Sequence, residues 1–158
     1  MIITWEGGQD FNLKTKNINV LLGEKIKLGE LEITGPGEYE VGGVQLEHFD
    51  GIVVTYAEGI AVGHIKRAAQ FNQEELEKLS AIDVLLIGVG GGDFTENKAA
   101  TEAITQIDPS IVIPMHGGNI EEFVKTEAAT QLEKEDFKIS KAELPQDERQ
   151  VIVLTPKQ

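Results

Sequence analysis

The first half of the chain alternates apolar and polar residues in short stretches, and polar or glycine-bearing turns separate these stretches. Such alternation over a few residues is typical of strands with one buried face. We therefore predict a meandering antiparallel sheet in this half. The expected strands are residues 2–5, 11–14, 18–22, 26–28 and 31–34, a pair within 35–49 hinged at Gly42-Gly43, and a hairpin of 52–56 and 60–64.

In the second half the period of the pattern changes and predicts helices. Asn72 followed three residues later by Glu75 is a capping-box pattern, which predicts the start of a short amphipathic helix. An apolar stripe over residues 99–107 predicts a second helix, capped by Asp93 or Thr95. The remaining expected elements are one or two helices over residues 120–132 and strands at 137–139 and 151–154.

The most regular unit of the sequence is a strand, a helix and a second strand. The first apolar run, residues 83–89, ends in Gly90–Gly92, and the second, residues 111–113, ends shortly before His116. This order predicts two parallel strands with the helix packed across them, and their apolar character predicts burial on both faces. Loops at the carboxyl ends of such strands often carry the chemistry of a protein. We therefore expect any active site between Asp93 and His116.

Length and composition are those of a soluble globular protein with one domain over residues 1–158, and the early strand meander followed by helix–strand alternation predicts an α+β architecture. The chain is 41% hydrophobic and 26% charged, and its 158 residues are enough for one core. No segment has the roughly 20 apolar residues that span a bilayer. The opening MIITWEGG has neither the basic region nor the apolar core of a secretion signal. With no cysteine for disulfides or thiolate ligands, we expect a cytoplasmic protein.

The formal net charge of −13 narrows the choice of partners. A surface this acidic repels phosphate backbones and anionic lipids. Lys25, Lys27, Lys66 and Arg67 are scattered among carboxylates and form no basic patch. We therefore expect no nucleic-acid partner and no membrane association.

Three histidines, His48, His64 and His116, are the candidates for metal binding or acid–base chemistry. A single histidine in a folded domain is more often structural than a ligand. His116 differs because it follows a buried strand directly and precedes Gly117-Gly118, where a strand end delivers a side chain to a cleft. It is a candidate catalytic residue, and the alternative is a histidine that bonds a neighbouring backbone group.

Asp93 and the glycines before it each have two interpretations. Asp93 is either a carboxylate base or ligand, or it caps the helix that follows. Gly90, Gly91 and Gly92 either cradle an anion at that helix N-terminus or allow tight packing. The run lacks the Gly-Lys-Thr ending of a phosphate loop and the spacing of a dinucleotide fingerprint.

Spacing alone predicts neither a metal cluster nor a serine nucleophile. A catalytic zinc needs about three closely placed ligands. The chain contains no His-x-His, no His-x-x-x-His and no Glu-x-x-His. Its serines, Ser80, Ser110 and Ser140, lie in no Gly-x-Ser-x-Gly elbow.

Three segments carry a resemblance to a known family. They are residues 2–7 (Ile-Ile-Thr-Trp-Glu-Gly), the Gly-Pro-Gly-Glu-Tyr-Glu-Val stretch at 35–41, and residues 82–116, with a Gly-Val-Gly-Gly turn and an Ile-Val-Ile-Pro-Met-His ending. With them the chain resembles, over nearly its whole length, the metallo-β-lactamase superfamily, in particular its small bacterial zinc-dependent hydrolases of the β-lactamase fold. The resemblance implies an αββα sandwich with a cleft along one edge of the paired sheets.

The chain departs from the family pattern at the metal ligands. The family's His-x-His-x-Asp-His motif has no counterpart between residues 18–22 and Gly35-Pro36, so we expect a truncated sandwich. The family's His-x-Gly-Asp, whose aspartate bridges the metals, is replaced by residues 64–67, His-Ile-Lys-Arg, and these cations would repel a metal ion. His116 matches the position of the last metal ligand in the family pattern, and His48 lies near the position of another metal ligand.

We therefore expect a catalytically inactive pseudoenzyme of the metallo-β-lactamase fold, without a cofactor, that has a binding or assembly role. A shortened sandwich leaves apolar surface and sheet edges uncovered, so we expect a homo-oligomer or a protein partner. The sequence identifies neither the partner, nor a substrate, nor the size of an oligomer.

Two alternatives remain open. One is a metal-dependent hydrolase with a residual site at His116 and His48 or His64, in which a zinc ion would also use Asp93. The other is a module for small anionic ligands, in which Lys66, Arg67 and the three glycines replace the positive charge of a metal.

Overall fold

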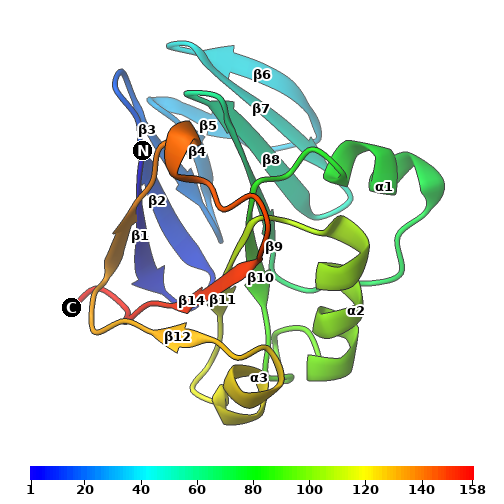
Figure 1. The fold of residues 1–158 in the computed structure, drawn as a ribbon. Helices are drawn as coiled ribbons and strands as arrows, with labels where there is room; N and C mark the ends of the chain where they lie inside the picture. The colour runs from blue at the N-terminus through cyan, green and yellow to red at the C-terminus, as the bar shows by residue number, and fades with distance from the viewer.

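Two β-sheets stacked face to face form the centre of the computed structural model, which describes residues 1–158 (Figure 1). The N-terminal strands bury every second side chain, as in Ile3 and Trp5 and again in Phe11 and Leu13. Side chains of a strand alternate between the two faces of a sheet, so this pattern turns one face of the first sheet toward the second. The predicted antiparallel meander is confirmed.

The first sheet has six strands in the order β13-β1-β2-β3-β4-β5. Their bounds are β1 (Ile2–Gly7), β2 (Asp10–Lys14), β3 (Asn19–Leu22), β4 (Ile26–Leu28), β5 (Leu31–Ile33) and β13 (Asp136–Lys138). The late strand β13 pairs with β1 and so ties the C-terminal part of the chain to its beginning.

The second sheet has eight strands in the order β12-β14-β11-β10-β9-β8-β7-β6. Their bounds are β6 (Gly37–Val41), β7 (Val44–Phe49), β8 (Ile52–Ala57), β9 (Ile60–Ile65), β10 (Val84–Gly88), β11 (Ile111–Met115), β12 (Thr130–Gln131) and β14 (Gln150–Val153). β6 to β9 are antiparallel, whereas β9, β10 and β11 run parallel. The parallel pair predicted from the two apolar runs is therefore confirmed, and every residue of β10 and β11 is buried.

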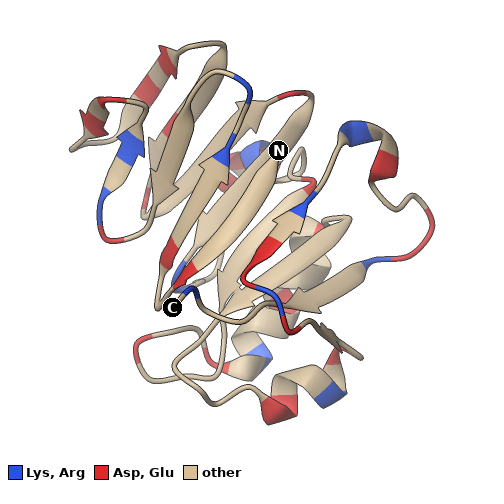
Figure 2. Ribbon diagram, turned by 90° about the vertical axis from the view of Figure 1, so that its left-hand side faces the viewer, with Lys and Arg blue, Asp and Glu red and all other residues tan.

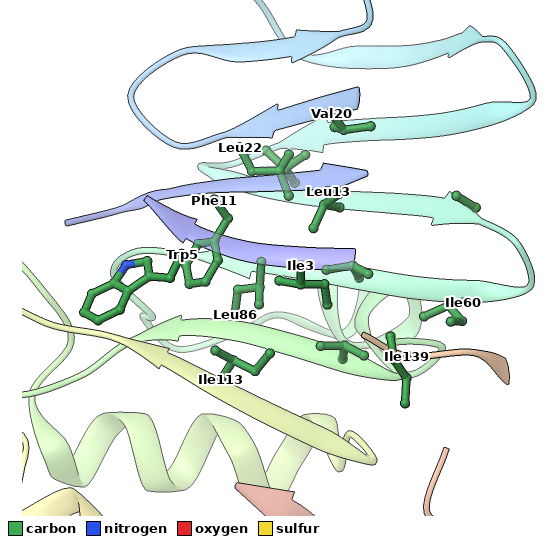
Figure 3. Close-up of a cluster of buried hydrophobic side chains, with 14 of the residues drawn as sticks. Ile3, Trp5, Phe11, Leu13, Val20, Leu22, Ile60, Leu86, Ile113 and Ile139 are labelled. Atoms are coloured by element: carbon green, nitrogen blue, oxygen red, sulfur yellow. The ribbon is translucent and has the colours of Figure 1, made fainter. Parts of the chain in front are cut away.

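The three α-helices cover the outer face of the eight-stranded sheet, and a short 3-10 helix lies apart from them, near the N-terminus (Figure 1). The α-helices are α1 (Gln73–Leu79), α2 (Asn97–Ile107) and α3 (Glu121–Thr126), and the 3-10 helix is Lys141–Glu143. Their buried residues belong to one core, whereas a second core of 22 buried residues lies between the sheets (Figure 3). The layers are thus sheet, sheet and helices, which is the predicted α+β sandwich, truncated on the side of the six-stranded sheet. None of the helices combines the length and the apolar character that a bilayer crossing requires.

Of two local predictions about helices, one is confirmed and the other is wrong in part. The capping box is confirmed, because the Asn72 side chain accepts from the Glu75 amide and Glu75 accepts from the Asn72 amide. The helical prediction over residues 120–132 is wrong beyond Thr126. There Ala128 takes a positive φ of 52°, and β12 then pairs in parallel with β14. Pairing with a distant strand outweighs local helix propensity at this point.

Candidate functional site

The loops that follow β10 and β11 lie side by side and form the predicted candidate site. The Val89 amide donates to the Met115 carbonyl at 2.9 Å, and the Asn119 side chain donates to the Gly90 carbonyl at 3.2 Å. Gly90 has a φ of 90°, and a Cβ at this position would collide with the Asn119 carbonyl oxygen. The two loops are therefore packed against each other, with no open cleft between them at Gly90.

His116 is fixed by a hydrogen bond from its own loop. The Gly118 amide donates to His116 Nδ1 at 3.1 Å, so Nδ1 carries the lone pair and the proton of the neutral ring is on Nε2. Nε2 is buried and has no hydrogen-bond partner. Burial lowers the pKa of His116, which favours this neutral form.

The Trp5 side chain occupies the space in front of the His116 ring. The two ring centroids are 4.9 Å apart and the planes are inclined by 43°, so the indole covers the imidazole. Trp5 itself donates from Nε1 to the Gly8 carbonyl at 3.0 Å, which holds the indole in place. The protonated edge of His116 therefore lies in an aromatic environment, where an N–H group can approach a π face.

His64 is a buried core residue. Its Nε2 donates to the Gln9 carbonyl at 2.7 Å, and its ring contacts Phe11 edge to face at 6.2 Å. Burial lowers the pKa of His64, since a charged imidazolium would lose its hydration here. This histidine joins the two sheets through a neutral ring.

His48 lies too far along the sheet to complete a site with the other two. It pairs with Val53 of β8, and Val53 pairs on its other side with His64 of β9. The two histidine backbones are thus two strand spacings apart, or about 10 Å. His48 Nδ1 donates to the Gly35 carbonyl at 3.2 Å. No three His, Asp or Glu side chains lie close enough together to hold a metal ion.

Asp93 is exposed and does not cap α2. The N-cap residue is Glu96, whose side chain makes no capping hydrogen bond. Thr95 is buried and used elsewhere, since its hydroxyl accepts from the Ala68 amide and donates to the Lys66 carbonyl. The prediction that Asp93 or Thr95 caps this helix is therefore wrong, because the loop ties Thr95 to the end of β9.

The glycine loop makes hydrogen bonds within the protein. The Gly90 amide donates to Asn97 Oδ1 at 3.1 Å, and the Gly91 amide donates to the Thr95 carbonyl at 3.0 Å. The Glu96 carboxylate lies against Gly91 and adds a negative charge beside the loop. The described contacts therefore favour the packing interpretation of these glycines over an anion cradle.

Lys66 and Arg67 follow β9 and stand near the loop but not in front of His116. Lys66 Nζ lies 5.8 Å from the centroid of the Phe94 ring, and Arg67 is exposed. The Phe94 ring also packs on Gly88 and Gly117, so it fills the space between three strand ends. Phe94 and Trp5 are thus the residues that shape this region. The sequence did not identify these two aromatic residues as part of the site, because they belong to no catalytic or metal-binding motif.

A depression of about 370 Å³ remains beside His116. Trp5, Glu133, Thr155 and Pro156 are among its lining residues, and Glu133 is the one charged side chain in the lining. Residues 155–157 cross the end of β1, since the Lys157 amide donates to the Trp5 carbonyl at 2.8 Å. Of the candidate site residues from the sequence, His116 alone contacts this depression.

These residues do not fit a zinc ion. A catalytic zinc is bound by about three nitrogen, oxygen or sulfur ligands. His116 offers no lone pair, because Nδ1 accepts from Gly118 and Nε2 bears the proton. His64 and His48 each donate one ring N–H to a backbone carbonyl and keep the other ring nitrogen free, but no three candidate ligands lie close enough together to hold a metal ion.

Comparisons with known proteins agree on the fold. The sequence profile of a beta-lactamase superfamily domain matches residues 6–116. A structure from Thermotoga maritima, of a protein assigned by proposal as a zinc-dependent hydrolase of the metallo-β-lactamase superfamily, is 24% identical, with 98% of both chains covered and a TM-score of 0.82. A metallo hydrolase from the hyperthermophilic archaeon Ignicoccus hospitalis is 13% identical over 72% of this chain and 81% of that chain, with a TM-score of 0.56. No curated protein matches the chain.

Proposed function

The chain belongs to the beta-lactamase superfamily, and we propose that it is a metal-free, catalytically inactive member with a binding or assembly role. The observation that carries the proposal is the state of His116. This residue matches the last ligand of the family pattern, yet the Gly118 amide occupies its Nδ1 and Trp5 covers its ring. A metal could bind this imidazole only after the proton had moved or the loop had opened.

The other candidate ligands support the same proposal. His64 and His48 each keep one free ring nitrogen, but two strand spacings separate their backbones, and no group of three candidate ligands forms. Asp93 is exposed and outside the lining of the depression at His116. No observation favours the hydrolase alternative at His116 and His48, because the two residues do not converge.

Uncovered sheet edges support a binding or assembly role. β5 ends the six-stranded sheet and β6 ends the eight-stranded sheet. Only residues 34–36 connect these strands, so both open edges lie on the same side of the sandwich (Figure 1). Leu31 on β5 is 44% exposed and is the exposed large hydrophobic residue of the chain. Open edges present unpaired backbone groups, which favour pairing with another chain.

Metal content and hydrolysis test the proposal together. Protein purified without chelator or affinity tag would be analysed by elemental mass spectrometry, before and after incubation with excess zinc and desalting. The same samples would be assayed on ester, thioester, phosphodiester and β-lactam substrates. We expect no stoichiometric metal and no turnover above that of a His116→Ala control. Stoichiometric zinc, or hydrolysis that the His116→Ala substitution abolishes, would contradict the proposal.

A further inference from the structure

The outer edge of β6 is free of any neighbouring strand. β6 joins β7 through Gly42-Gly43, whose φ values are 59° and 80°, so the connection is a two-residue hairpin turn. In such a hairpin the flanking pair, Val41 and Val44, exchanges hydrogen bonds, and bonded and non-bonded pairs then alternate. The N–H and C=O groups of Glu38 and Glu40 therefore point away from β7, toward the open edge.

A shallow acidic depression of about 330 Å³ adjoins this edge on the outer face of the sheet. Its lining includes Glu38 and Glu40 of β6, Glu47 of β7 and Tyr56 of β8. Burial and the nearby Glu47 carboxylate raise the pKa of Tyr56. Lys78 of α1 forms an ion pair with Glu47 at 2.8 Å, whereas Glu38 and Glu40 are exposed and have no ion pair.

Charge disfavours pairing of this edge with the same edge of a second copy of the chain. Pairing β6 with another β6 would place Glu38 and Glu40 beside the same carboxylates of the second copy, and like charges opposite each other destabilise paired strands. The net charge of −13 adds to this repulsion. Figure 2 shows β6 at the top of the molecule with acidic positions and no basic one. Charge thus opposes self-pairing, while the backbone groups of the edge remain available.

We propose that β6 docks an extended basic segment of a protein partner, which adds to the eight-stranded sheet as a further strand. Side chains at alternate positions of an extended segment are about 7 Å apart on one face, and Glu38 and Glu40 have this same spacing along β6. Two Lys or Arg residues at alternate positions therefore each meet one carboxylate. Backbone hydrogen bonds supply affinity in this mode, and the side chains supply specificity.

This inference names the class of partner for the proposed binding role and rests on it. The docking edge is separate from the His116 region. β6 lies five positions from β11 in the sheet order, which corresponds to about 24 Å. A change at β6 is therefore expected to leave the surroundings of His116 unaltered.

A synthetic peptide in which Lys or Arg alternates with Val and Thr is the direct probe. Titration into the full-length 15N-labelled protein should shift the amide signals of residues 37–41 and 56, with an affinity that falls as salt is raised. A peptide with Glu at the basic positions is the charge control. A third peptide, N-methylated on the amides that face β6, keeps the charge but loses the backbone donors, and should bind about tenfold more weakly.

Matched variants of the protein test the edge itself. Glu38→Gln with Glu40→Gln should weaken the basic peptide about fivefold, because two exposed ion pairs are lost. Glu30→Gln with Glu32→Gln makes the same change of net charge near the β5 edge and should bind like the wild type. Absence of binding, equal weakening by both double variants, full affinity of the N-methylated peptide, or shifts confined to other strands would each overturn the inference.

The outcome is distinguishable from that of the metal and hydrolysis measurements. If the protein is metal-free and inactive but does not bind the peptide, the proposed function stands and the inference about β6 fails. If the protein is a zinc-dependent hydrolase that binds the peptide at β6, the inference about β6 stands and the proposed function fails.

Discussion

The Gly118 amide donates a hydrogen bond to Nδ1 of His116 at 3.1 Å. Ligating histidines commonly donate their second ring N–H to a neighbouring acceptor, which leaves the other nitrogen free for the metal. Here the neighbour is a donor, so the ring is held in the opposite tautomer. The histidine thus stands where the family pattern has a ligand, but its tautomer differs from that of such a ligating histidine.

Replacement of His116 by alanine tests whether this residue is structural. The substitution removes the ring that packs on Trp5, and we expect a loss of about 1 kcal/mol in the free energy of unfolding. Metal content and oligomeric state should not change. Urea melts, elemental analysis and light scattering measure the three quantities. A change in metal content or oligomeric state would show that His116 does more than pack.

The pH dependence of stability follows from burial of His64. Burial lowers the pKa of His64 below its ordinary value of 6.5, so below that pH the unfolded chain binds more protons than the folded chain. The contribution of the neutral ring is fully present above this value and is lost as the pH falls toward the folded pKa. We expect urea melts to show lower stability at a pH of about 5.5 than at about 7.5. A His64→Gln variant with an unchanged pH dependence would contradict this assignment.

The packing of the two site loops is tested at two glycines. A Cβ at Gly90 would collide with the Asn119 carbonyl oxygen at a φ of 90°, so Gly90→Ala should cost about 3 kcal/mol. Gly92 also has a positive φ, 67°, but no atom lies within 4 Å of its added Cβ. Gly92→Ala is thus the matched control and should cost about 1 kcal/mol, from backbone conformation alone. Equal losses in chemical denaturation would mean that the loops do not meet at Gly90.

Thr55 offers a prediction of increased stability. Its hydroxyl is buried between the sheets and has no hydrogen-bond partner. Thr55→Val replaces the hydroxyl by a methyl group of similar shape and should stabilise the protein by about 1 kcal/mol. A clear loss of stability in thermal or urea melts would show that the hydroxyl has an acceptor.

The pattern of apolar and polar residues within single strands and helices was sufficient to predict most of the fold. The alternation at Phe11 and Leu13, the apolar run of β10 and the capping box at Asn72 each reflect an interaction with nearby chain or with a single buried layer. Local pattern was insufficient at residues 127–132. The strand there exists because β14, about twenty residues further on, supplies its partner.

The candidate site was only partly predictable for a related reason. The position of His116 at the end of β11 follows from the apolar run before it. Its tautomer depends on the path of the backbone at Gly118, and its cover depends on Trp5 from the opposite sheet. Neither contact can be inferred from the spacing of residues in the sequence. The same holds for Thr95, which bonds to the end of β9 instead of capping α2.

The protonation of the His116 ring tests the central claim most directly. Long-range 1H–15N correlation spectra at a pH of about 7.5 distinguish a protonated from an unprotonated ring nitrogen, and His116→Gln assigns the signals. We expect Nε2 protonated and Nδ1 unprotonated, with no change when zinc is added in excess. A protonated Nδ1, together with an Nε2 signal that moves on zinc addition, would contradict the account and identify His116 as a metal ligand.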